Sequence, residues 1–444
     1  MKRINYILLL AAAMMTSGCA NDEVIDNSAK VEMKFRVTAD NPTRAANAFC
    51  NNNMPTEFTL SCDVDGQGLP LFAYERMTPN GEYWKFADNQ NNYYWATDTY
   101  FNYAFYATNA PKPTNLPIKS TDSFTGYDEN EDGYHFIKNF FNNSFMSKRH
   151  IIHTVPTNAS EQKDLLFAHT RKKSNEVTNG VVTLNFAHLL SKVVFYAKVT
   201  DSKLLVQIDE VKVCNVFTKG RFEMEGRSTP NTDGNFADHS TSGTAPTYLD
   251  ELDRNWYASS SYQSTSDSQH SAVGTHTTGN FGVKNTPANA SGVGTAVNLS
   301  DDTETADGHT NSTNITNTLM LIPQVTTAWD PAAHTTPQAG SYFLVKCRIW
   351  DVKSPGTLVD PSDKTNGSVE LWPNESGVTT EYIAIPFAAS WKAGRKYVYT
   401  FVFGNSGGFG GYDPSNGKKV LVPITLKCDV HQFDDIYKDG TLDK

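Results

Sequence analysis

The sequence predicts an all-β protein built from β-sandwich domains, and three observations lead to this fold class. Many short segments alternate apolar and polar residues with a period of two, the pattern of a strand with one face on a core and one toward water. Clusters of Gly, Pro, Asn, Asp and Ser separate these segments, as turns do. No amphipathic helix pattern occurs after residue 19. A chain of 444 residues is long enough for two such sandwiches.

Residues 1–18 have the composition of a lipoprotein signal peptide. A positively charged start precedes the apolar run 7–15, and residues 16–19 resemble a lipobox. The apolar run is too short to span a bilayer as a helix. We therefore expect acylation of Cys19 by palmitate-type chains, followed by an acidic polar tether over residues 19–30. An ordinary signal peptide with an incidental cysteine is the alternative.

The first predicted strand has one of the cleanest patterns in the chain, because Val31, Met33, Phe35 and Val37 alternate with polar residues. Residues 100–107 carry aromatic side chains on both faces, which predicts a strand covered on both sides. The other strands predicted in this half of the chain are 58–64, 84–86, 93–95 and 151–155.

Residues 164–199 form the stretch around which we expect the rest of the chain to be organised. Residues 181–186 alternate apolar and polar side chains, and residues 193–199 do so again after a short joint at 188–191. A segment of this length that bends at a short joint can pass from one sheet or domain into the next.

The second half of the chain contains a polar insert over residues 226–318. A structureless loop of this length is uncommon inside a compact domain, and we expect an exposed excursion from the fold. Strands are predicted again at 319–322, 342–350, 381–387, 397–403 and 420–430. The last of them has six apolar residues in phase: Val420, Val422, Ile424, Leu426, Cys428 and Val430.

Five cysteines remain besides Cys19, and an odd number cannot pair completely within one chain. Cys62, Cys347 and Cys428 are in phase with the apolar residues of predicted strands, so we interpret them as core thiols. A bridge between Cys50 and Cys62 stays open as an alternative in an oxidising compartment.

Motifs that carry catalysis are not found. No Gly-x-Ser-x-Gly, His-Glu-x-x-His or Cys-x-x-Cys sequence is present, and the glycines at 407–411 lack the spacing of a phosphate loop. Asp128, Asn130 and Asp132 match the first half of a calcium loop, but Asn139 stands where an EF-hand needs a bidentate glutamate. We interpret this segment as an acidic turn, with a weak calcium site as the alternative. We expect no cofactor and no enzymatic activity.

The charge and the aromatic residues limit the classes of ligand. A net charge of −10 argues against binding to nucleic acid or to anionic lipid. Trp84, Tyr93, Tyr94 and Trp95 lie around Asn-rich turns, and we expect them to pack in the core or in loops. A sugar-stacking platform is the alternative for these four rings.

Several motifs, in order along the chain, resemble the fimbrillin-like surface lipoproteins of Bacteroidales. Each motif is weak alone, but together they cover nearly the whole chain after residue 30. They are Phe35 with Thr43-Arg44-Ala45, then residues 103–107, 164–168, 188–193, 321–324 and 391–399.

The resemblance implies two tandem transthyretin-like Greek-key β-sandwich domains, over residues 31–175 and 176–444, the second with the insert 226–318. It also implies a structural or adhesive component of a cell-surface fimbria, as pilin subunit, tip or anchor. Such a protein is a surface-exposed lipoprotein of the cell outer membrane. Its partners are other fimbrial subunits, the membrane through the lipid on Cys19, and a host or bacterial surface ligand.

The resemblance further implies a mode of assembly. In the pilins that this chain resembles, an arginine-specific protease removes the N-terminal strand and a neighbouring subunit supplies a replacement strand. Here the strand from Val31 to Val37 is the candidate detachable strand, Arg44 the candidate processing site, and residues 420–430 the candidate donor strand. The alternative assembly hypothesis keeps both strands in their own sandwiches. The alternative function is a surface glycan-binding lipoprotein that uses aromatic stacking.

Overall fold

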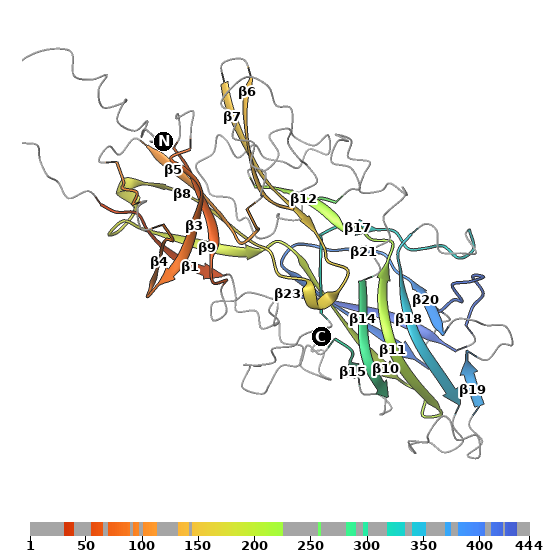
Figure 1. Cartoon of the computed structure of the whole chain (residues 1–444). Helices are drawn as coiled ribbons and strands as arrows, with labels where there is room; N and C mark the ends of the chain where they lie inside the picture. Colours follow the sequence, from red (N-terminus) through yellow and green to blue (C-terminus); the bar gives the residue numbers. More distant parts are fainter. Residues whose placement is uncertain are drawn as a thin grey trace, which may run out of the picture.

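In a computed structural model, the regular elements of the described residues are almost all β-strands (Figure 1). Within the described residues, no helix is long and apolar enough to cross a membrane. The all-β fold class is therefore confirmed. The described residues are 31–39, 55–64, 70–88, 92–96, 101–112, 132–141, 144–224, 256–258, 281–289, 296–300, 318–333, 340–351, 369–373, 381–404, 410–420 and 422–432.

Seven strands at the N-terminal end form a closed barrel in the order β1-β4-β3-β2-β5-β8-β9. The ring closes because β1 pairs with β4 on one side and with β9 on the other. The sheet predicted for this part of the chain thus has no free edge. The barrel strands are β1 (Lys34–Ala39), β2 (Phe58–Val64), β3 (Phe72–Asn80), β4 (Tyr83–Phe86), β5 (Asn102–Thr108), β8 (Leu166–Lys173) and β9 (Val181–His188).

The barrel core follows from the alternation along each strand. On β9, Val182, Leu184 and Phe186 are fully buried while Thr183 and Asn185 are exposed. All of β5 except its first residue is buried, as the aromatic residues on both of its faces predict. One face of β5 lines the barrel, and the other carries Tyr106 into the larger core of the molecule.

Two sheets at the other end of the molecule pack face to face as a sandwich. Ring contacts cross the interface, with the Phe195 centroid 5.5 Å from that of Phe343. One sheet has the order β15-β10-β22-β23, with β16 also beside β10, and the other has the order β14-β11-β18-β19, with β20 also beside β18. Their strands are β10 (Ser191–Val199), β11 (Leu204–Cys214), β14 (Phe281–Asn289), β15 (Ala296–Asn298), β16 (Leu319–Leu321), β18 (Tyr342–Asp351), β19 (Val369–Trp372), β20 (Tyr382–Pro386), β22 (Arg395–Phe403) and β23 (Ile424–Gln432).

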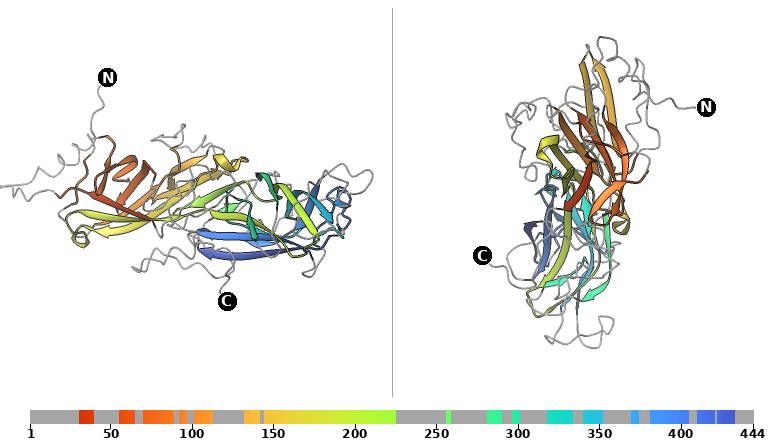
Figure 2. Two further views of the ribbon diagram at one scale, coloured as in Figure 1. Left: turned by 90° about the horizontal axis from the view of Figure 1, so that it is seen from below. Right: turned by 90° about the vertical axis from the view of Figure 1, so that its left-hand side faces the viewer.

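A further sheet lies between these two parts, in the order β13-β12-β7-β6. The barrel and the sandwich occupy opposite ends of an elongated molecule (Figure 2). The remaining elements are β6 (Gly133–Phe141), β7 (Ser144–Thr154), β12 (Lys219–Glu223), β13 (Trp256–Ala258), the two-stranded sheet β17 (Val325–Thr326) with β21 (Ala389–Ser390), and the short 3-10 helices η1 (Ala159–Glu161) and η2 (Ser174–Glu176).

The predicted organising stretch connects the two ends of the molecule. The chain leaves the barrel at the end of β9 and enters the sandwich at the start of β10, with only Leu189 and Leu190 between them. The joint is buried: His188 Nδ1 lies 2.6 Å from Asp164 Oδ2, and the Leu189 amide donates to the Leu165 carbonyl. The division of the chain after residue 175 stays a prediction, and β9, which follows that point, pairs with β1 and β8.

The described segments of the polar insert lie in sheets, whereas its composition predicts an exposed excursion. Within residues 226–318, the described segments β13, β14 and β15 pair with β12, β11 and β10. Trp256 of β13 is almost fully buried, and its Nε1 donates to the Leu189 carbonyl at 2.8 Å. Short strands separated by polar residues lack the periodicity that reveals longer strands, so the sequence pattern did not show them.

Candidate functional site

Strand β1 closes the barrel, and its two sides are held unequally. On one side it makes six parallel pairs with β9, from Lys34↔Val181 to Ala39↔Phe186. On the other side it makes one antiparallel pair with β4, Phe35↔Trp84. The residues before β1 bind a different segment, the one that contains Tyr93: the Met33 amide donates to the Tyr93 carbonyl at 2.9 Å. Loss of β1 would therefore leave the edges of both β9 and β4 unpaired.

The side chains of the β1 segment fill the barrel core. Phe35 is fully buried and contacts Phe86 and Phe105 edge to face, with centroids 5.8 and 5.6 Å away. Met33 is buried and Val37 is partly buried, whereas Val31 is 46% exposed at the rim. The strand thus contributes a central side chain of the core, and its removal would open a hydrophobic groove.

Gly180 allows the β1 segment to lie close to the start of β9. Its φ is +75°, and a Cβ at this position would be 2.2 Å from the Glu32 carbonyl oxygen. Its own carbonyl accepts hydrogen bonds from the Lys34 amide and from Trp95 Nε1, at 3.0 and 3.2 Å. Only glycine fits here, because a Cβ would collide with the Glu32 backbone and with the Val31 side chain.

We predict that Gly180→Ala lowers the free energy of unfolding by roughly 1–3 kcal/mol, since the methyl group must push the β1 segment away. Urea unfolding measures this loss, and hydrogen exchange at the Lys34 amide should become faster. Gly81→Ala is the matched control, because Gly81 also has positive φ (+65°) but a Cβ there meets nothing within 4 Å. Equal losses in the two variants would mean that the close approach to Glu32 does not matter.

The C-terminal strand β23 lies at an edge of the sandwich. It pairs antiparallel with β22 over its whole length, from Arg395↔Gln432 to Phe403↔Ile424. In the described part of the chain, no strand pairs with its other side. An edge strand of this kind presents a row of backbone donors and acceptors to another chain.

The apolar residues predicted for the last strand divide into two groups. Val420, Val422 and Ile424 are buried in the core of the sandwich, and Leu426 is partly buried. Cys428 is exposed and Val430 is 57% exposed, although both are in phase with Ile424. The strand itself begins at Ile424, later than the predicted start at Val420. The interpretation of Cys428 as a core thiol is therefore wrong, because the outer half of this edge strand is not covered.

The other cysteines in the described residues are buried and form no disulfide. Cys62 and Cys347 are core thiols, as predicted, and Cys214 is buried as well. Burial raises the pKa of the Cys62 thiol well above its ordinary value, and it raises the pKa of Cys214 to about 12. These thiols are therefore protonated at neutral pH and unreactive. Cys50, the alternative bridge partner of Cys62, lies outside the described residues.

Three further predicted sites fall partly or wholly outside the described residues. These are Cys19, Arg44, and the calcium candidates Asp128 and Asn130. Asp132 is described, and its carboxylate accepts hydrogen bonds from the Thr154 amide at 3.0 Å and the Thr154 hydroxyl at 2.8 Å. Among the residues that the structure describes, no group of three or more His, Cys, Asp or Glu side chains is placed to hold a metal ion.

The aromatic residues around the Asn-rich turn mostly belong to the barrel core. Trp95 is buried against Tyr103, Trp84 packs on Phe58, and Tyr93 packs on Phe72. Tyr94 is 43% exposed. A sugar-stacking platform needs several exposed rings side by side, and three of these four rings are used in packing.

A buried ion pair that the sequence analysis missed joins the β6–β7 sheet to the barrel. Arg149 of β7 is fully buried and makes a bidentate ion pair with Asp63 of β2, with Nη2 2.6 Å from Oδ1. Its guanidinium carbon also lies 4.4 Å from the centroid of the Tyr106 ring. Close beside it, the Tyr134 hydroxyl donates to Ser61 Oγ at 3.0 Å.

Electrostatics keep this arginine charged in the interior. Burial lowers the pKa of Arg149, but the Tyr134 hydroxyl and the Asp63 carboxylate outweigh that effect, so the pKa lies above its ordinary value. Burial also raises the pKa of Tyr134, which therefore stays protonated as a hydrogen-bond donor. The network can orient the hairpin on the barrel, since a bidentate arginine pair has a fixed geometry.

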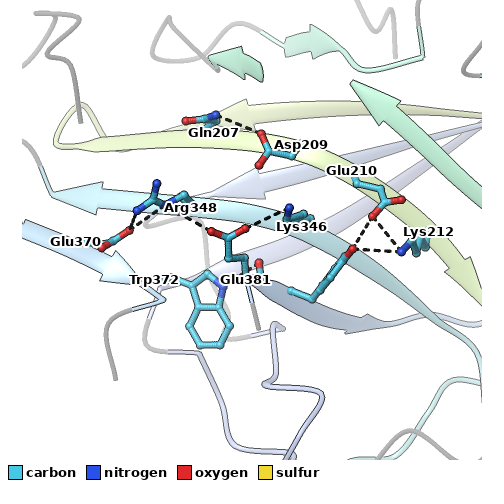
Figure 3. A network of polar contacts seen from close by, with 10 residues as sticks. Gln207, Asp209, Glu210, Lys212, Lys346, Arg348, Glu370, Trp372 and Glu381 are labelled. Atoms are coloured by element: carbon cyan, nitrogen blue, oxygen red, sulfur yellow. Dashed lines mark hydrogen bonds and ion pairs between the residues drawn. The ribbon is translucent and has the colours of Figure 1, made fainter. Parts of the chain in front are cut away.

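A second polar network covers the outer face of the β11-β18-β19 sheet (Figure 3). Arg348 of β18 binds Glu370 of β19 through Nε and Nη2, at 3.0 and 2.8 Å. Lys346 of β18 reaches Glu381 at 3.3 Å, just before β20. Such exposed pairs contribute about 0–1 kcal/mol each and mainly favour one pairing of the strands.

A smaller cluster in the same network joins β11 to β20. Tyr382 of β20 donates its hydroxyl to Glu210 at 2.6 Å, and Lys212 donates to both. Figure 3 shows Lys212 beside the Glu210 carboxylate. It lies beside the β-bulge at 208–210, where the register of β11 shifts. Its donors and acceptors are thus paired with one another, so we interpret the cluster as stabilising rather than ligand-binding.

Comparison with known proteins gives one family match. Residues 43–262 match the sequence profile of the fimbrillin-like family, a range that begins before β2 and ends just after β13. No curated protein matches the chain significantly.

Among solved structures, 22 chains match. A candidate cell adhesion protein from Bacteroides uniformis ATCC 8492 is 13% identical, covering 92% of this chain and 99% of that one with a TM-score of 0.37. Another from Bacteroides ovatus ATCC 8483 is 11% identical, covering 93% and 100% with a TM-score of 0.39. A fimbrial assembly protein from Parabacteroides distasonis ATCC 8503 is 10% identical, covering 84% and 91% with a TM-score of 0.30.

Proposed function

The chain belongs to the fimbrillin-like family through residues 43–262, and on that premise we propose that it is a structural or adhesive subunit of a cell-surface fimbria. It acts without catalysis. The observation that supports this function best is the pair of strands at its two ends. Strand β1 closes a barrel that would otherwise have a groove, and β23 is an edge strand with an exposed apolar outer half.

In the proposed assembly, cleavage after Arg44 frees β1, and β23 of a neighbouring subunit fills the groove by β-strand addition. The vacated groove offers unpaired backbone on β9 and β4, together with the space of the Phe35 side chain. The incoming strand offers Cys428 and Val430, which its own sandwich leaves exposed. The exposed groove is unstable until it is filled, which drives polymerisation.

The same proposal gives the location and partners of the protein. Palmitate-type acylation of Cys19 anchors it in the cell outer membrane, with the tether 19–30 leading to the exposed domains. Its partners are other fimbrial subunits and a surface ligand on host or bacterial cells. The alternative function, a glycan-binding lipoprotein, is disfavoured because Trp95 is in the barrel core and Trp84 and Tyr93 pack against it.

The decisive experiment treats the purified chain with an arginine-specific protease. We expect cleavage after Arg44 and then SDS-resistant ladders, and Arg44→Ala should give no ladder. Cys428→Asp with Val430→Asp should leave folding intact, because both side chains are exposed, but should abolish the ladder after cleavage. Lys427→Asp is the matched control on the same strand, since it is exposed and out of phase with the apolar residues. Clean cleavage that leaves only monomer would contradict assembly by strand addition.

A further inference from the structure

Strand β23 has one side paired with β22 and one side without a paired strand in the described part of the chain. Phe403 lies opposite Ile424, and the adjacent hydrogen bond joins the Gly404 amide to the Pro423 carbonyl at 2.9 Å. Phe403 and Ile424 are therefore a pair without mutual hydrogen bonds, so the amide and carbonyl of Ile424 point away from β22. The Gly410 amide donates to the Ile424 carbonyl from that other side at 2.9 Å.

Every second residue after Ile424 presents its backbone to the same side, which we call the open edge. These residues are Leu426, Cys428 and Val430, and no backbone group of the described residues pairs with them there. Cys428 is exposed and Val430 is 57% exposed, so the outer half of the open edge is accessible. Figure 2 shows β23, in dark blue, as the outermost strand of its sheet. An accessible strand edge can be extended by a strand of another chain.

The sequence of β23 is complementary to itself when the strand is reversed about Cys428. In an antiparallel pair of two copies centred on this residue, Leu426 lies opposite Val430 and Lys427 lies opposite Asp429. Apolar residues then meet on one face of the sheet, and opposite charges meet on the other face. A lysine on a sheet edge usually discourages pairing, but in this register the second strand places a carboxylate opposite it.

The neighbouring two-fold registers lack this complementarity. An antiparallel pair centred on Lys427 sets two lysines opposite each other, and a pair centred on Asp429 sets two carboxylates opposite each other. Like charges directly opposite each other destabilise a strand pair. A pair centred on Leu426 would need the Ile424 carbonyl, which the Gly410 amide already binds. The charges and the accessible backbone groups therefore favour the register described above.

We propose that two copies of the uncleaved chain form a symmetric dimer in which β23 pairs with β23 about Cys428. The two Cys428 residues exchange hydrogen bonds through their backbones, and Leu426 does the same with Val430 of the second copy. Such a contact is isologous, because the same strand forms both sides of it. It joins the two sheets into one and removes the open edge of each. The dimer forms while β1 still fills its own barrel, so it is a contact beyond strand exchange.

The test measures self-association of the purified, uncleaved chain by sedimentation velocity over a series of protein concentrations, with a reducing agent present so that no disulfide contributes. We expect a weak, reversible dimer, because strand pairing at one edge buries little area. Lys427→Asp and Asp429→Lys each set like charges opposite each other, and each should raise the dissociation constant roughly tenfold or more. Lys203→Glu is the matched control, since it is exposed, lies in the turn before β11 and changes the net charge as Lys427→Asp does. It should leave the dimer unchanged.

Two further variants test the register and the backbone. Lys427→Asp with Asp429→Lys in one chain exchanges the two charges. The register about Cys428 again sets opposite charges against each other, so this double variant should dimerise like the wild type. Val430→Pro removes an amide that points away from β22, so β23 should stay in its own sheet while the dimer is lost. Urea unfolding of each variant checks that the sandwich is folded.

Three outcomes would overturn the proposed dimer. The wild-type chain could remain monomeric at every concentration, the single variants could associate as the Lys203→Glu control does, or the double variant could be folded and yet monomeric. If a charge variant unfolds more easily than the wild type, Val430→Pro decides alone, and a dimer that survives this substitution contradicts the β23 contact. No protease is used in these measurements, so their result is independent of ladder formation.

Discussion

Phe35→Ala is expected to lower the free energy of unfolding by roughly 3–5 kcal/mol, the usual cost of truncating a fully buried phenylalanine. Phe35 lies on the strand that closes the barrel and contacts Phe86 and Phe105. The truncation leaves a cavity that these rings cannot fill without moving, and it weakens the side of β1 that has a single pair with β4. Urea unfolding monitored by tryptophan fluorescence gives the free energy.

Val31→Ala is the matched control for this prediction. Val31 precedes the same strand and is in phase with Phe35, but it is 46% exposed, so its truncation should change stability by about 0.5 kcal/mol or less. A loss at Phe35 as small as the loss at Val31 would show that β1 contributes little to the barrel. Removal of β1 would then not open a groove unstable enough to drive strand exchange.

Asp63→Ala is expected to cost roughly 3–5 kcal/mol, because it leaves the Arg149 guanidinium buried without its counter-ion. Asp63 is partly exposed but Arg149 is not, so the penalty arises from the arginine. The loss should appear in urea unfolding and as faster hydrogen exchange along β7, since this pair fixes the hairpin to the barrel.

A double replacement separates the ion pair from the packing. Asp63→Leu with Arg149→Met should recover most of the stability, because replacing both partners of a buried pair by apolar groups is often neutral. Glu82→Ala, at the exposed Arg36–Glu82 pair, should cost about 1 kcal/mol or less. If Asp63→Ala behaved like Glu82→Ala, Arg149 would have to reach solvent or another partner once Asp63 is lost.

The alternation of side chains was enough to predict most of the individual strands, but not their neighbours. Strands β9, β10 and β22 lie where their apolar patterns predict strands, but only β9 has an exposed face, since β10 and β22 are buried on both faces. The parallel pairs of β1 with β9 and of β10 with β22 have no local signature. Parallel pairing depends on how distant segments meet, whereas alternation reports only which face of a strand is buried.

Alternation along the sequence also predicts only part of the candidate site. The phase of Val420 to Val430 predicts one continuous apolar face, yet only the first half of it is buried, because an edge strand can extend past the core that it helps to build. Arg149 could have been found from its phase, since it stands two residues before Ile151 on the face that packs inward. A charged residue at a core position indicates a buried partner. Its partner Asp63, however, lies on a strand far away in the sequence.

The parallel pairs also determine the order in which the chain can fold. Lys34 pairs with Val181 and Lys192 pairs with Lys396, so each sheet is completed by a segment that is synthesised long after its partner. Contacts between such distant segments form slowly, because the loop between them must first be closed. While the chain grows from its N-terminus, β1 has no β9 to pair with until residue 181 has been made. Its apolar residues stay accessible during that interval. A chaperone or a protease can therefore reach this segment most easily while the chain is still being synthesised.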